Sequence, residues 1–264
     1  MIASLPMYQP AGDAVQSFWS KFAALLQASA DCSIPTVLSF PDDLFAHWRS
    51  PGLLLSQTCG YPFSTMLFDQ VQLVGTFAYA VPGARGIACR SQLVCRTTDP
   101  RKALSAFAGG TVAFNAKDSQ SGYNALRALV AQASALRPFF SQAVESGAHV
   151  NSIELVRTGA VDMAAIDAVT WALWQHDNPD HAPALRVFGE TDAYPGLPLI
   201  TALGTSSELL DHMRSCLLAV ATQPDYAPWR NPLRIHGFEV TKPSDYALCK
   251  AMQAQALGLG MSAL

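Results

Sequence analysis

Charged residues are scarce in this 264-residue sequence: Asp, Glu, Lys and Arg together make up only 14% of it. The formal net charge is −3, and no run of Lys or Arg is present. Contacts between basic side chains and phosphates supply much of the affinity of nucleic-acid-binding proteins. The composition therefore argues against nucleic acid as a partner.

Long apolar runs are also absent, and none reaches the length that a membrane-spanning helix needs. The first six residues, MIASLP, do not show the basic start, apolar stretch and cleavage site of a signal peptide. The sequence as given therefore predicts a cytoplasmic chain that does not span a membrane. A mature chain trimmed of its signal peptide would look similar, and such a chain would be periplasmic.

Motifs for metal binding are missing. The six cysteines and six histidines form no CxxC pair, no HExxH motif and no Cys/His cluster at metal spacing. The cysteines are also too few for a disulfide scaffold, so buried thiols are the expected role of most of them. We predict no metal and no other cofactor.

Signatures of catalysis are equally sparse, since no G-x-S-x-G motif, Walker loop or G-x-G-x-x-G loop occurs. Cys59, Ser56 and Ser121 are conceivable nucleophiles, but the sequence places no base or pKa-lowering group beside them. A buried thiol is the better interpretation of Cys59. We predict no catalytic residue.

Apolar strands and helical patterns alternate along the chain, and half of its residues are hydrophobic. Residues 2–5, 36–40, 53–56 and 72–79 are predicted strands, and residues 14–28 carry apolar side chains at helical spacing. Because the strand residues are nearly all apolar rather than alternating, helices should cover both faces of each sheet. The sequence predicts an α/β fold with mostly parallel sheets flanked by helices.

Two turn-rich segments, residues 81–86 and 191–198, interrupt this alternation. A second series of predicted strands lies between them, at residues 90–96, 111–114, 143–146, 163–167 and 185–189. The remainder of the chain is too short for a third domain, so it is expected to return to the first lobe. We predict two lobes with a ligand cleft between them: residues 1–83 with 195–264 form the first, and residues 84–194 the second.

The anion turn, which we define as residues 118–124 (DSQSGYN), follows an apolar strand and opens a helical pattern. The first turn of a helix offers unpaired backbone N–H groups, and Ser119 and Ser121 add hydroxyls beside them. Gly122 lets the backbone approach a ligand closely. The alternative is that Asp118 or Ser119 merely caps the helix.

Polar residues follow other apolar strands too, and the ends of strands are where open α/β sheets bind ligands. In the first lobe the candidates are Tyr8, Ser56, Gln57, Thr58, Tyr61 and Tyr79. In the second lobe His149 is interpreted as an anion contact, with a helix cap or a half-buried histidine as the alternative. Asp167 is equally consistent with a helix cap and with a carboxylate that faces a cationic group of a ligand.

Several segments together resemble the substrate-binding proteins of phosphonate-type ABC transporters, the PhnD-like family. The run Ser119-Gln120-Ser121-Gly122-Tyr123 resembles the S-x-S-G helix start of that family, and Gly147-Ala148-His149 resembles its histidine turn. Further similar segments are RSQLV at 90–94, GAVDMAAID at 159–167 and PGLP at 195–198. The resemblance implies the type II periplasmic-binding-protein fold.

The resemblance also implies a site for a phosphonate or phosphate-like head. Its second-lobe residues would be Ser119, Gln120, Ser121, Gly122, Tyr123 and His149. Tyr8 and the loop 56–61 would close from the first lobe, while Asp167 and Glu190 would face the variable part of the ligand. Gln120 stands where a small hydroxyl residue is frequent in the family. The implied function is a solute-binding protein that works with an ABC transporter permease, and an enzyme or a sensor on the same scaffold is the alternative.

Overall fold

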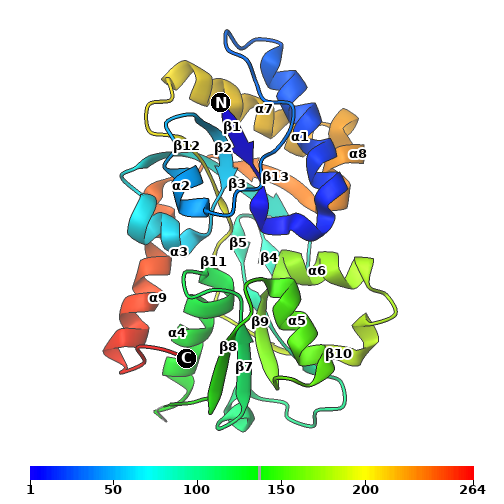
Figure 1. Cartoon of the computed structure of the whole chain (residues 1–264), viewed down its shortest axis with the longest axis vertical. Coiled ribbons are helices and arrows are strands. Elements are labelled where there is room, and N and C mark those ends of the chain that lie inside the picture. The colour runs from blue at the N-terminus through cyan, green and yellow to red at the C-terminus, as the bar shows by residue number, and fades with distance from the viewer. Residues whose placement is uncertain (136–137) are drawn as a thin grey trace. The chain divides into compact units, whose positions relative to one another are not determined.

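The chain forms two compact α/β units (Figure 1). The computed structural model describes residues 1–135 and 138–264. Unit 1 consists of Met1–Ala80, Arg85–Ile87 and Pro195–Tyr246. Unit 2 consists of Val81–Ala84, Ala88–Tyr194 and Ala247–Leu264. The predicted α/β class is confirmed.

Unit 1 is built on a five-stranded sheet with the order β1-β2-β12-β3-β13. Its strands are β1 (Ile2–Ser4), β2 (Leu53–Gln57), β3 (Val71–Tyr79), β12 (Pro198–Ala202) and β13 (Ile235–Glu239). Its α-helices are α1 (Gly12–Gln27), α2 (Leu44–Trp48), α3 (Gly60–Pro62), α7 (Ser207–Thr222) and α8 (Ala227–Arg230). Short 3-10 or π turns occupy Pro6–Ala11, Phe63–Leu67, Pro224–Tyr226, Asn231–Leu233 and Pro243–Tyr246.

The long helix α1 follows from its apolar spacing. Val15, Phe18, Trp19, Phe22 and Leu26 recur every three or four residues and are all buried. The indole N–H of this helix's tryptophan donates to a loop carbonyl at 2.9 Å, so its one polar atom is satisfied in the core. The helix predicted at residues 14–28 is therefore confirmed.

Residues 36–40 form a loop instead of the predicted strand. Val37 and Phe40 are exposed, so the apolar run does not bury the faces that a covered strand would bury. The backbone N–H and the hydroxyl of Ser39 both donate to the carbonyl of Ala3, at 2.8 and 2.9 Å. Two hydrogen bonds from one residue to a distant carbonyl stand here in place of a sheet ladder, which the apolar pattern could not reveal.

Unit 2 is built on a second five-stranded sheet with the order β10-β6-β9-β7-β8. Its strands are β6 (Ser91–Arg96), β7 (Thr111–Phe114), β8 (Gln142–Glu145), β9 (Met163–Asp167) and β10 (Leu185–Glu190). Its α-helices are α4 (Ala125–Ala133), α5 (His149–Thr158), α6 (Ala168–Asp177) and α9 (Ala247–Gly258). A π turn at Gln120–Asn124 precedes α4, and 3-10 turns occupy Leu104–Phe107 and Ala182–Ala184. All five strands lie where the sequence predicts them, within one or two residues.

Both sheets are mixed, which corrects the prediction of mostly parallel pairing. In unit 1 only β1 and β2 pair in parallel, whereas β12 and β13 run antiparallel to their neighbours. In unit 2 strands β8, β7 and β9 pair in parallel, while β6 runs antiparallel to both β9 and β10. Apolar strands indicate a covered sheet, but they do not fix the direction of each strand.

Three short strands occur where the chain passes between units. They are β4 (Ala84–Arg85), β5 (Ala88–Cys89) and β11 (Tyr194–Pro195), and they pair in the order β11-β5-β4. These passages lie in or directly beside the two turn-rich segments that the sequence singles out. The predicted boundaries are at residues 83 and 195, and the units divide between residues 80 and 88 and after Tyr194.

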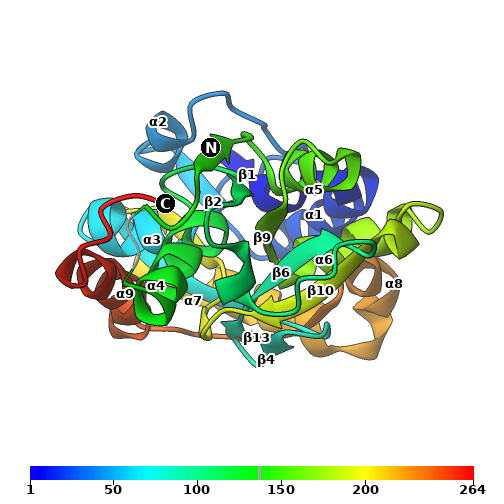
Figure 2. The ribbon, with the colours of Figure 1, turned by 90° about the horizontal axis from the view of Figure 1, so that it is seen from below.

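The C-terminal segment belongs to unit 2, which contradicts the prediction that all of residues 195–264 return to the first lobe. Helix α9 lies beside α4 in both views (Figures 1 and 2). Ala256 and Met261 share an apolar cluster with Leu126 and Val130 of α4. The chain therefore passes between units once more, after Tyr246. This passage directly follows the short turn Pro243–Tyr246, which the sequence analysis did not interpret as a boundary.

Truncating Met261 to Ala should lower the free energy of unfolding by about 2–5 kcal/mol, because this side chain is 1% exposed in the α4 cluster. Leu257→Ala is the matched control, since Leu257 is 48% exposed and should change stability by about 0.5 kcal/mol or less. Urea denaturation measures both. Equal, small effects would contradict the packing of the C-terminal segment on unit 2.

Candidate functional site

The anion turn contains a π turn rather than the regular start of an α-helix. The N–H of Asn124 donates to the carbonyl of Ser119 at 2.9 Å, and the N–H of Ala125 donates to the carbonyl of Gln120. Both bonds span five residues instead of four. Such wide turns are rare and occur frequently at functional sites. Every residue from Ser119 to Asn124 is buried.

Ser119 caps this turn. Its Oγ accepts from the N–H of Gly122 at 3.1 Å, so the capping alternative is right for Ser119. Asp118 is half-buried, and burial raises the pKa of its carboxyl, with the charge of Glu145 adding to the effect. The hydroxyl of Ser121 takes no part in this cap.

Position 122 has no room for a side chain, because two other side chains lie close to its backbone. A Cβ at this position would lie 2.0 Å from Oδ1 of Asn115 and 3.1 Å from Cε1 of His149. Among the residues that the structure describes, Asn115 Oδ1 is buried and has no hydrogen-bond partner. The sequence predicts that the backbone comes close to something at Gly122, and in the structure these two side chains are there.

Ser121 and His149 form the central pair of the site. Ser121 Oγ lies 2.7 Å from Nε2 of His149, the first residue of α5, and 3.4 Å from the hydroxyl of Ser119. The hydroxyl of Ser91 donates to the carbonyl of Ser121 at 2.8 Å and fixes the backbone. The structure thus brings together three of the predicted site residues, which come from two separate segments.

The His149 ring is neutral at pH 7, because burial lowers its pKa to about 4. Its Nδ1 is buried and has no hydrogen-bond partner within residues 1–135 and 138–264. With the proton on Nε2, the ring donates to Ser121, whose own hydroxyl is then free to donate to an anion. The pair can therefore act as a relay of neutral donors.

Two neighbouring candidates point elsewhere. The amide of Gln120 is 1% exposed, with Nε2 3.2 Å from the sulfur of Met252 and Oε1 accepting from Asn124 at 2.9 Å. The ring of Tyr123 packs between Phe114 and the guanidinium of Arg127. These orientations argue against the prediction that the Gln120 and Tyr123 side chains contact a ligand, because both are used inside unit 2.

The two predicted acidic residues have partners in unit 2. Asp167 caps α6, since its Oδ1 accepts from the N–H groups of Val169 and Thr170, both at 2.9 Å. Glu190 is exposed at the end of β10 and accepts from the amide of Gln92 at 3.0 Å. For Asp167 the capping alternative is therefore right. A ligand contact by either carboxylate remains a prediction.

Unit 1 brings Tyr8, Gln57 and Tyr79 together. The two tyrosine rings meet edge to face with centroids 5.5 Å apart, and the amide of Gln57 donates to the hydroxyl of Tyr79 at 3.4 Å. The three residues line a cavity of about 10 Å³. Such a volume holds about one water molecule.

The other unit 1 candidates differ in their surroundings. Ser56 is buried and its hydroxyl donates to the adjacent carbonyl of Gln57 at 3.1 Å. Thr58 is fully buried, and its hydroxyl has no partner among the described residues. Tyr61 is half-buried, and its carbonyl accepts from two hydroxyls of the following turn. Thr58 is thus the one whose polar atom the unit leaves unsatisfied.

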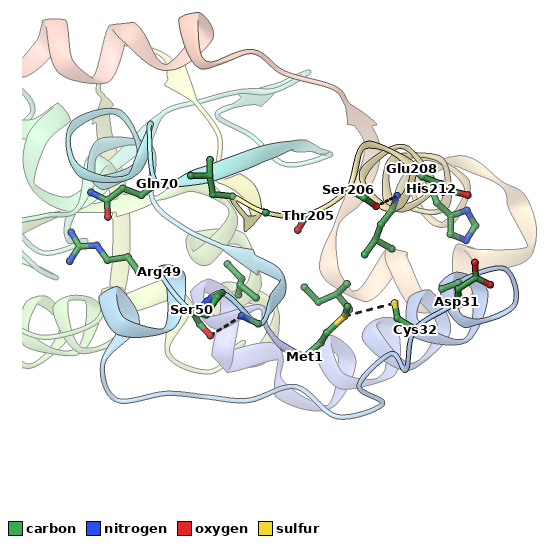
Figure 3. Close-up of a pocket in the computed structure, with 18 of the residues that line it drawn as sticks. Met1, Asp31, Cys32, Arg49, Ser50, Gln70, Thr205, Ser206, Glu208 and His212 are labelled. Carbon is green, nitrogen blue, oxygen red and sulfur yellow. Dashed lines mark hydrogen bonds between the residues drawn. The ribbon is translucent and has the colours of Figure 1, made fainter.

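A much larger cavity, of about 840 Å³, lies elsewhere in unit 1 (Figure 3). It is bordered by the start of β2, at Leu53 and Leu54, and by Glu208 and His212 of α7. Since β2 runs from Leu53 to Gln57, this cavity adjoins the end of the strand remote from the loop 56–61. None of the predicted site residues lines it, and no sequence motif indicated it.

Sequence reasoning missed Asn115, which directly follows strand β7. The rule that selected other polar residues at strand ends could have found it, because Asn115 comes directly after the apolar run of residues 111–114. Within the described part of the chain, no group of three or more His, Cys, Asp or Glu could hold a metal ion. No helix among those residues is long and apolar enough to cross a membrane.

A family model described as "ABC transporter, phosphonate, periplasmic substrate-binding protein" matches residues 59–246. A binding protein component of an ABC phosphonate transporter from Pseudomonas aeruginosa has a similar structure, with a TM-score of 0.79 and 14% identity over 98% of this chain and 87% of that one. PhnD1 from Prochlorococcus marinus in complex with methylphosphonate gives a TM-score of 0.77 and 14% identity over 96% of both chains.

The protein XAC2383 from Xanthomonas citri bound to ATP gives a TM-score of 0.68 and 16% identity over 98% of both chains. At these identities the likeness to solved structures shows a shared fold. No curated protein matches the chain.

Replacing Gly122 by Ala should lower the free energy of unfolding by roughly 1–3 kcal/mol, because the new methyl group meets Asn115 Oδ1. Gly258→Ala in α9 is the control: no atom lies within 4 Å of its Cβ position, so the change should be neutral or stabilising. In a double-mutant cycle, Asn115→Ala should relieve part of the Gly122→Ala loss. Strict additivity in urea denaturation would contradict the close approach.

Proposed function

The chain belongs to the family of periplasmic substrate-binding proteins of phosphonate ABC transporters, and from this premise we propose that it binds a phosphonate or phosphate-like anion for uptake. Members of this family bind a small ligand and work with a transporter permease; they are not enzymes. We place the anion at the π turn of unit 2, and we place the protein in the periplasm.

One observation carries the proposal: the hydroxyls of Ser119 and Ser121 and the ring of His149 meet at the start of a helix. Helix starts favour anions because their first N–H groups are unpaired and the helix dipole is positive there. The π turn and α4 run without a break from Gln120 to Ala133, so the dipole of the whole segment points at this place. Ser119, Ser121 and His149 are the residues we assign to the charged head.

The proposed donors carry no net charge. Hydroxyl and N–H dipoles that are already oriented can stabilise an anion strongly where water is excluded. Two of the structurally similar proteins are described with methylphosphonate and with ATP, and both ligands carry a tetrahedral phosphorus–oxygen group. Methylphosphonate and inorganic phosphate are therefore the first probes for this chain.

We assign to unit 1 the remaining contacts with the ligand, through Tyr8, Gln57, Thr58, Tyr61 and Tyr79. Their support is the cluster of polar atoms at the ends of β2 and β3, including the unsatisfied hydroxyl of Thr58. Binding would then bring the two units together, as closure around ligands does in periplasmic binding proteins.

Ser121→Ala should weaken methylphosphonate or phosphate binding about tenfold to a hundredfold, because it removes one hydrogen bond to a charged group, worth roughly 1.5–3 kcal/mol. Folding should change less, since the capping hydroxyl of Ser119 remains. Titration calorimetry measures the affinity. Ser207→Ala, at the start of α7 in unit 1, is the control. If Ser121→Ala binds like the wild type, the anion is not held at this turn.

Affinity should depend on pH through His149. The free ring has a pKa of about 4, and a bound anion raises it, so binding takes up a proton between these two pKa values. Affinity should therefore fall as the pH rises through the bound-state pKa and become constant above it. His149→Gln removes this contribution and leaves only the titration of the ligand itself. Calorimetry in buffers of different ionisation enthalpy counts the protons, and identical pH profiles for the wild type and His149→Gln would contradict the role.

A further inference from the structure

The helix that carries the anion turn presents a buried polar face to the C-terminal segment. Gln120, Asn124 and Arg127 follow one another at helical spacing, and each is at most 5% exposed. Gln120 Nε2 lies 3.2 Å from the sulfur of Met252. Asn124 Nδ2 donates to the carbonyl of Cys249 at 2.8 Å, and a guanidinium nitrogen of Arg127 donates to the carbonyl of residue 262 at 3.1 Å.

The same three side chains also bond to one another, with Asn124 in the middle. Its amide nitrogen donates to Oε1 of Gln120 at 2.9 Å, and its amide oxygen accepts from Arg127 at 3.2 Å. Asn124 is fully buried, and the residues around it include the apolar side chains of Ala125, Ala128 and Met252. The three side chains thus share two hydrogen bonds, and among the described residues Nε of Arg127 is their one buried atom without a partner. Such a buried network favours one arrangement over others, because a shift leaves further polar atoms unpaired.

Asn124 is also the residue at which the π turn closes. Its backbone N–H makes the five-residue bond to Ser119, while its side chain is tied to α9. In a regular α-helix each residue advances by about 100° around the axis, so the loss of the extra residue would rotate Ser121 by about that angle. The 2.7 Å contact between Ser121 and His149 therefore depends on the wide turn.

We infer that Asn124 is a positioning residue for the anion site: its hydrogen bond to the Cys249 carbonyl of α9 holds the anion turn in the π register that directs Ser121 at His149. The C-terminal segment is thereby part of the support of the ligand site and not only a cover for the core of unit 2. The ligand part of this inference rests on the proposed function, whereas the structural part concerns the Ser121–His149 contact alone.

Asn124→Leu tests the inference, because leucine keeps the size of the side chain and removes all of its hydrogen bonds. The Ser121–His149 contact should be lost, which exposes the ring, so the pKa of His149 measured by NMR should rise from about 4 towards its ordinary value of 6.5. Methylphosphonate affinity should fall at least tenfold. Gln132→Ala is the matched control: Gln132 sits on α4, makes an exposed contact with Gln255 of α9 and lies beyond the π turn, so it should change neither value.

A second variant and a measurement on the wild type cover the case in which Asn124→Leu does not fold. Asn124→Ala also loses the donor to Cys249 and adds no charge that would itself change the pKa of His149, and it should shift the His149 titration in the same direction. In native-state hydrogen exchange of the wild type, the N–H of Asn124 should open together with the N–H groups of α9. Separate opening would overturn the inference.

The possible results distinguish the positioning role of Asn124 from the proposed binding of an anion. If an Asn124 variant lowers the melting temperature while the His149 titration stays at its wild-type value, Asn124 is only a core residue and the inference is overturned. If the wild type binds neither methylphosphonate nor phosphate, the proposed function fails. The His149 titration of the variants still decides the positioning role in that case.

Discussion

The five-residue hydrogen bond from Asn124 to Ser119 is the constraint on which the site depends. A π turn places one more residue in its hydrogen-bonded ring than an α-helix does and is rare, so it persists only where its surroundings favour it. Here three features cooperate: the Ser119 cap, the absence of a side chain at Gly122, and the side-chain contacts of Asn124. Ser121 comes to face the ring of His149 because all three act on one turn.

The side chains proposed to donate to the anion, Ser119, Ser121 and His149, carry no charge of their own at pH 7. Arg101 of unit 2 is paired with Asp99 and Asp162. The guanidinium of Arg127 lies against the turn itself, over the ring of Tyr123 and bonded to Asn124. At the turn itself the titratable ring is neutral at pH 7, because burial lowers its pKa to about 4. Selectivity for an anion would then come from oriented dipoles, and the strength of such dipoles depends on how firmly the turn is held.

Much of unit 2 could be predicted from sequence, because its strands are apolar runs bounded by turns and its key turn carries a local signature. Ser119 and Gly122 are informative wherever they occur before a helix, since a cap and a close backbone approach need those residue types. The predicted strand at residues 36–40 is wrong because its signal was composition alone. Their apolar composition resembles a strand, yet Val37 and Phe40 are exposed, and exposure depends on what packs nearby.

Gln120 illustrates a second limit. Its position in the motif suggests a ligand contact, but its partner is Met252, more than a hundred residues away in the chain. A single sequence does not reveal which distant residues are in contact. The spacing of a motif also does not show which of its side chains point into the core and which point towards a ligand. The same limit hid the passage between units after Tyr246, because the alternation of strands and helices does not record which unit a final helix joins.

The match to the family ends at residue 246, and unit 1 also ends there, at Tyr246. The anion turn lies inside the matched region, whereas α9, which bonds to the turn through Asn124, lies wholly outside it. The proposed anion residues of unit 2 thus lie inside the matched region, whereas the helix that bonds to their turn lies outside it. A motif can identify such a turn, but it does not extend to the segment that packs against the turn.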